Sequence, residues 1–256
     1  MQKWCVRFAR LVGVLALIAL GCGPFRVKAA RLAEAKKVAL AALSVRVQLH
    51  EGRDGTTSDA IASGLVASTQ LGDVPALAEA AVRRVLERDL GAKVVPLAEV
   101  EASERFQRLR AGLGVIEGDT DVTPPALLSS ARARRLDNSE LESVRSALGV
   151  DAIVVAHVSV FVGDTSGYSL MGLGNREKHL AARVDVLLLD RGRKDPAWRD
   201  TEALGPASSR GIPEASFVKV ISGKEIPVAL IQEIVPEAID GACQVLGARL
   251  RKKLGR

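Results

Sequence analysis

The sequence contains few aromatic residues, few cysteines and no long apolar run. Aromatic residues make up 3% of the 256 residues, so the core must be built from Val, Leu, Ile and Ala among the 48% that are hydrophobic. The longest uncharged, mostly apolar run, Leu11–Leu20, is shorter than the roughly 18 to 20 residues that span a bilayer. Of the three cysteines, Cys5 and Cys22 lie near the start and Cys243 near the end, which leaves no internal disulfide in the processed chain described below.

Motifs for catalysis or metal binding are also missing. The three histidines, His50, His157 and His179, do not have the spacing of a helical metal-binding pair. No Gly-x-Ser-x-Gly elbow is present, and the glycines at 172 and 174 lie between predicted strands, not before a helix, so they predict no phosphate site. His157 is interpreted as a hydrogen-bonded core residue, Arg183 and Asp185 as a solvated strand face, and Cys243 as a small buried hydrophobe. The sequence predicts no enzyme activity, no cofactor and no metal.

The first 24 residues carry the most specific signal. Three basic residues precede the apolar run, which ends in Ala19-Leu20-Gly21-Cys22. This order resembles the signal peptide of a bacterial lipoprotein, whose lipobox is cut before a lipidated cysteine. The resemblance implies cleavage between Gly21 and Cys22 and attachment of acyl chains, palmitate among them, that bind membrane lipid through Cys22. Gly23 stands where an aspartate would resemble an inner-membrane retention signal, so the expected location is the outer membrane, facing the periplasm.

Charge and composition then define the predicted parts of the chain. We expect a signal peptide over 1–21, a lipidated tether over 22–37 and one periplasmic α/β domain over 38–256. Removing residues 1–21 lowers the formal net charge from +6 to +3, which is too small and too scattered to predict a nucleic-acid partner. The tether is rich in Lys and Arg. These cations either touch anionic head groups or form a solvated linker.

Hydrophobic periodicity predicts the fold class. Strict alternation or apolar runs predict five strands, over 43–50, 93–97, 151–162, 180–188 and 198–204. The strand over 151–162 is apolar on both faces and is therefore expected at the centre of the sheet. Helical spacing follows Pro75, recurs near 101–111 and 139–148, and lines one face of a long C-terminal helix from Val228. We expect an α/β fold, a single sandwich of a mixed sheet of about five strands with helices packed against it.

A second resemblance comes from the helix-to-strand unit Leu148-Gly149-Val150-Asp151-Ala152-Ile153-Val154-Val155. It resembles the corresponding unit of the curli-secretion lipoprotein, of the lipoprotein activators of penicillin-binding proteins and of the TolB amino-terminal domain. In those proteins a hairpin follows the central strand and a terminal helix closes the domain. The resemblance implies a binding or assembly role and gives no catalytic residue to carry over.

The expected function is that of a non-enzymatic, lipid-anchored protein-binding or envelope-assembly factor whose partner in the envelope is unknown. Apolar residues on a glycine-flanked loop are candidate partner contacts. They are Tyr168, Leu170, Met171 and Leu173. The same loop can also fold back on its own domain. A homo-oligomer is possible on this sequence, and two alternatives stay open: a subunit of an outer-membrane secretion channel and a hydrolase acting on the cell wall.

Overall fold

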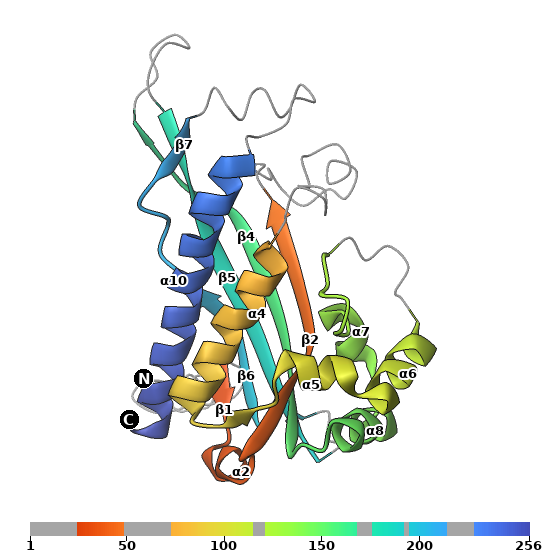
Figure 1. The fold of residues 1–256 in the computed structure, drawn as a ribbon. Coiled ribbons are helices and arrows are strands. Elements are labelled where there is room, and N and C mark those ends of the chain that lie inside the picture. Colours follow the sequence, from red (N-terminus) through yellow and green to blue (C-terminus); the bar gives the residue numbers. More distant parts are fainter. Residues whose placement is uncertain (1–24, 49–72, 115–120, 168–175, 192–194, 214–227) are drawn as a thin grey trace, which may run out of the picture.

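A computed structural model of the chain describes residues 25–48, 73–114, 121–167, 176–191, 195–213 and 228–256. Its centre is a mixed sheet of seven strands (Figure 1), with six in the order β1–β6–β5–β4–β2–β3 and β7 paired with β5. The strands are β1 Phe25–Val27, β2 Lys37–Gln48, β3 Lys93–Val94, β4 Ala152–Gly167, β5 Arg176–Asp190, β6 Trp198–Leu204 and β7 Gly211–Pro213. β2 runs parallel to β3 and β4, and the other pairs are antiparallel.

The α/β class, the mixed sheet and the long C-terminal helix are confirmed, but the strand number is wrong. Seven strands are present where about five were expected. The two that were not predicted, β1 and β7, have three residues each and are too short to show an alternating pattern. β4 lies between β2 and β5 and is buried on both faces over residues 152–156, as its apolar sequence predicted.

Helices lie on both faces of the sheet, with α10 and α4 along one of them. The described helices are α2 Ala29–Glu34, α4 Val74–Val85, η1 Leu86–Leu90, α5 Leu97–Ala102, α6 Glu104–Leu113, α7 Ser130–Arg135, α8 Asn138–Leu148 and α10 Val228–Leu254. α10 packs on β5 and β6, with α4 beside it against β2 (Figure 1). Gly205 allows the closest approach, because a Cβ there would lie 2.4 Å from the backbone nitrogen of Ala242 in α10. None of the described helices is long and apolar enough to cross a membrane.

The opposite face is covered by helices at one end. Strand register places Ser44, His157 and Asp185 in one row across β2, β4 and β5. Ser44 accepts a hydrogen bond from the backbone of Ser130, so α7 lies on this face. Nearer the start of β4, Ile153 and Val155 share the face and are fully buried, whereas His157 is partly exposed. The expected sandwich is therefore not confirmed. We call the region around His157, where that side chain is partly exposed among the described residues, the open face.

Residues predicted to form a tether belong to the folded domain from Phe25 onward. β1 pairs with β6, and α2 follows it directly. Every described strand, helix and core residue lies between Phe25 and Arg256. A chain that begins at residue 23 therefore keeps all of the described structure.

Candidate functional site

The residues predicted as sites lie outside the described residues. Gly21 and Cys22 belong to the segment 1–24, and Tyr168, Leu170, Met171 and Leu173 belong to 168–175. Their flanks are described. Phe25 opens β1 three residues after Cys22, and β4 and β5 flank the segment 168–175 as one long hairpin. These strands extend beyond the predicted ranges 151–162 and 180–188, because Thr165 pairs with Lys178 and Gly167 with Arg176 in the ladder.

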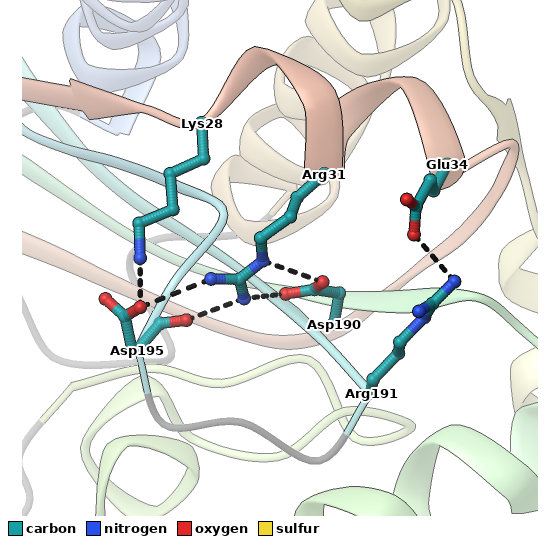
Figure 2. A network of polar contacts seen from close by, with 6 residues as sticks. All are labelled: Lys28, Arg31, Glu34, Asp190, Arg191 and Asp195. Atoms are coloured by element: carbon teal, nitrogen blue, oxygen red, sulfur yellow. Dashed lines mark hydrogen bonds and ion pairs between the residues drawn. The ribbon is translucent and has the colours of Figure 1, made fainter.

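Ionic contacts hold α2, next to the predicted anchor, against the turn between β5 and β6 (Figure 2). Arg31 donates from Nε to Asp190 over 3.0 Å and also pairs with that carboxylate through Nη2. The same guanidinium contacts the Asp195 carboxylate at 3.2 Å, and Lys28 pairs with Asp195 as well. Arg191 lies 2.6 Å from Glu34 at the other end of α2. We call these six residues the α2 clamp.

Burial makes the α2 clamp more than a surface contact. Asp190 is 5% exposed, and its hydrogen bond with Arg31 raises the pKa of that guanidinium above the ordinary value. The hydrogen bond from Lys28 correspondingly lowers the pKa of Asp195. A cavity of about 60 Å³ adjoins the clamp. Its lining contains cations and anions, among them Arg31, Glu34, Arg145 and Asp190. Because these lining charges already pair with protein groups, the arrangement fixes α2 and does not present a free charge to a ligand.

A second polar cluster lies on the open face and centres on His157. Nε2 of His157 lies 3.0 Å from the Asp121 carboxylate, and Nδ1 lies 3.9 Å from that of Asp185. Asp121 also accepts from Nε of Arg46 over 2.5 Å, and Arg183 lies 3.5 Å from Asp185. The cluster thus alternates cation and anion across β2, β4, β5 and the segment that carries Asp121.

The two carboxylates favour a charged imidazole. Burial alone lowers the pKa of His157, but hydrogen bonding and charge from Asp121 and Asp185 outweigh burial and raise the pKa above its ordinary value. Burial raises the pKa of Asp121, but His157 and Arg46 outweigh it and lower that pKa. The Ser159 hydroxyl lies 3.4 Å from Nδ1, at the long limit of a hydrogen bond. The Ser159 hydroxyl is therefore bonded to the imidazole only weakly.

Sequence reasoning recognised part of this cluster. His157 is hydrogen-bonded and mostly buried, as interpreted, and Arg183 is exposed. The interpretation of Asp185 as solvated is wrong, since it is 8% exposed and faces His157. Asp121 was missed because no helix or strand was predicted between 111 and 139, where it lies. The register of β4 with β5, which places His157 opposite Asp185, is the signal that identifies the pair.

The remaining chemical candidate, Cys243, has a structural explanation. Cys243 is buried in α10, and burial raises the pKa of its thiol to about 12, so it is a packed hydrophobe as predicted. Within the described ranges, no group of three His, Cys, Asp or Glu side chains has the geometry to hold a metal ion.

Comparison with known proteins does not assign a family. No protein-family model matches the sequence, and no curated protein matches it closely enough to count as a relative.

The His157 cluster predicts a specific pH dependence of stability. The folded-state pKa of His157 is raised above its unfolded pKa of about 6.5. The contribution of His157 to the free energy of unfolding is therefore complete below the unfolded pKa and is lost as pH rises through the folded pKa. We expect His157→Gln to remove this loss, so that the free energy of unfolding changes less between pH 5.5 and pH 8.5 than in the unmodified chain. Urea unfolding at the two pH values measures it. His179→Gln is the control and should retain the His157 contribution; an unchanged pH dependence in His157→Gln would contradict the assignment.

Proposed function

We propose that this chain is a bacterial lipoprotein that is anchored through Cys22 and holds an α/β domain at the periplasmic face of the outer membrane. The observation that carries the proposal is the lipobox-like Ala19-Leu20-Gly21-Cys22, followed three residues later by the first strand of the sheet. Three residues span at most about 10 Å. A domain joined to its lipid by so short a connection stays next to the membrane surface.

The α2 clamp supports a fixed orientation of that domain. β1 pairs with β6, and Arg31 joins α2 to Asp190 and Asp195, so the chain is held by the sheet from Phe25 onward. A flexible tether would let the domain turn freely, whereas this connection directs one end of the sheet toward the lipid. The open face then presents itself to other envelope components.

We propose that the domain acts by contact and is not an enzyme. The open face carries charged groups of both signs together with Leu204, whose surface is 51% exposed, a combination suited to a protein partner. His157 between two carboxylates suits a structural ion pair, and the Ser159 hydroxyl lies 3.4 Å from its Nδ1, at the long limit of a hydrogen bond. The resemblance to periplasmic assembly lipoproteins also favours a binding role.

The candidate contacts Tyr168, Leu170, Met171 and Leu173 stay a prediction, as do an envelope protein partner and a homo-oligomer. These residues belong to the segment between β4 and β5, and the described strand pairing runs to Gly167 and Arg176 on either side of it. The open face and this segment are therefore connected by the same hairpin, which favours one partner-binding region over two.

The anchor is tested by replacing the lipidated residue. In Cys22→Ser, we expect no incorporation of labelled palmitate and an unprocessed precursor, because a serine hydroxyl does not form the thioether that the lipidation step makes. Membrane fractionation of the whole chain, with palmitate labelling, measures both. Cys243→Ser is the matched control, since it removes a buried thiol and should leave lipidation and fractionation unchanged. Normal processing and outer-membrane sedimentation of Cys22→Ser would reject the lipoprotein proposal.

A further inference from the structure

A basic stripe lies on α10 beside the start of the folded chain. Arg249, Lys252 and Lys253 have the i, i+3 and i+4 spacing of one helix face, and Arg256 follows Gly255, whose left-handed conformation lies just beyond the end of the helix. The Arg249 guanidinium lies over the Phe25 ring, with 4.8 Å from its carbon to the ring centroid. The stripe therefore begins where β1 begins, and Figure 1 shows β1, α2 and the C-terminal end of α10 at the same end of the molecule.

Strand β3 extends this basic surface. Arg256 of the C-terminal end donates to the carbonyl of Leu90, and Lys93, the first residue of β3, follows Leu90 by three residues. The backbone nitrogen of Lys93 donates to Lys36, so the two lysines are adjacent. We call Lys36, Lys93, Lys252, Lys253 and Arg256 the basic end. All five are exposed, and within the described residues none of the four lysines has a carboxylate partner.

Asp89 and Asp200, two buried carboxylates that pair with arginines of α10, do not neutralise the basic end. Asp89 is fully buried and pairs with both Arg88 and Arg251, so this group keeps an excess positive charge. Asp200 is also fully buried and lies 3.2 Å from Nε of Arg249. The exposed lysines therefore face solvent without an opposing acid from these two residues.

Ion pairs of the α2 clamp use two of the cations in the predicted tether, which are then not available to an external partner. Lys28 and Arg31, which the sequence placed in a basic tether, are occupied by Asp195 and Asp190 (Figure 2). Lys36 from that segment stays exposed and joins the surface formed by α10 and β3. Positive charge available to a partner thus comes from the folded domain at the end nearest Cys22.

We propose that the basic end lies on the membrane surface and binds the head groups of anionic phospholipids. The proposal rests on the lipid anchor proposed above, which brings this end of the sheet within about 10 Å of the lipid. A basic residue close to an anionic surface strengthens binding about fivefold, and several acting together orient a domain. The anchor supplies attachment, and the basic end sets which side of the domain faces the membrane.

Vesicle binding tests the surface without the anchor. Residues 23–256, which contain all described elements, are mixed with vesicles of phosphatidylcholine alone or of phosphatidylcholine with phosphatidylglycerol, and bound protein is measured by sedimentation. We expect binding only to the anionic vesicles and weaker binding at high salt. Lys252→Gln/Lys253→Gln should weaken it about twentyfold or more.

The matched control removes the same charge elsewhere. Arg134 and Arg135 are exposed on α7, away from the end of α10 (Figure 1), and Arg134→Gln/Arg135→Gln should change binding less than about twofold. Circular dichroism checks that each variant is folded. Equal weakening by both pairs, or equal binding to neutral and anionic vesicles, would overturn the proposal.

The two proposals fail separately. A lipidated Cys22 with no preference for anionic vesicles rejects the basic end and leaves the lipoprotein proposal standing. If anionic vesicles are bound through Lys252 and Lys253 but Cys22 is never lipidated in the whole chain, the basic end is supported and the lipoprotein proposal is rejected.

Discussion

Val155→Asp is expected to destabilise the domain by about 4 kcal/mol or more. Val155 is fully buried on β4, the strand between β2 and β5, and pairs in register with Ala42 and Leu187. An aspartate there either loses its hydration as a charged group without a partner or takes up a proton, and both cost free energy. For a domain of this size such a loss lowers the melting temperature by about 10 °C. Thermal melting of residues 23–256, followed by circular dichroism, measures it.

A matched substitution separates burial from the mere addition of charge. Leu204 lies on β6 with 51% of its surface exposed, so Leu204→Asp keeps its carboxylate in water. We expect that variant to differ from the unmodified domain by no more than about 0.5 kcal/mol. A melting temperature for Val155→Asp within about 2 °C of the unmodified domain would show that β4 is not the centre of the sheet.

The sequence predicted the long elements of the fold because their burial leaves a periodic pattern. β4 shows no polar face over 152–156, and β5 alternates Arg183 and Asp185 with apolar residues. Short elements leave no such pattern: β1 has three residues and pairs only with β6, a strand more than 170 positions away. α7 was missed for the same reason, since its six residues lie between 111 and 139, where no helix or strand was predicted.

The polar clusters were harder to predict because their partners are distant in sequence. Arg31 meets Asp190 only when β1 and α2 fold back on the β5–β6 turn, a contact that no local pattern encodes. His157 was recognised as a bonded histidine, but its partner Asp121 lies more than 30 residues earlier and reaches it only through the sheet edge at Val122. Residue type thus predicted the bonding of these groups, and strand register decided their partners.

The same reasoning predicts the helix boundary at α8 only approximately. Helical spacing was predicted from residue 139, but the helix begins at Asn138 and Asp137 caps it. Its carboxylate accepts from the backbone of Glu140, and the Glu140 side chain accepts from the backbone of Asp137 in return. Three consecutive residues with capping side chains cannot be ordered by propensity alone, and the reciprocal bond with Glu140 selects among them.

The second large effect is expected from Arg31→Met, which removes the cation of the α2 clamp and keeps much of its apolar stem. Asp190 then loses Arg31 as a partner while remaining buried, and breaking one side of a buried pair costs about 3 kcal/mol. Urea unfolding of residues 23–256 measures the loss. Asp190→Asn added to Arg31→Met removes the remaining charge and should recover a large part of it.

The consequence for function follows from where the clamp lies. Loss of Arg31 leaves α2 joined to the β5–β6 turn by the more exposed pairs of Lys28 with Asp195 and of Glu34 with Arg191, and β1 by its three-residue pairing with β6. We therefore expect limited proteolysis to cut the Arg31→Met chain near α2 before it cuts the core, whereas Arg191→Met, at an exposed pair with Glu34, should be cut as slowly as the unmodified chain. A connection that orients the sheet on the membrane must resist local opening. If the free energy of unfolding of Arg31→Met is within about 0.5 kcal/mol of that of the unmodified domain, and both chains are cleaved at the same rate, the clamp does not fix the domain to its anchor.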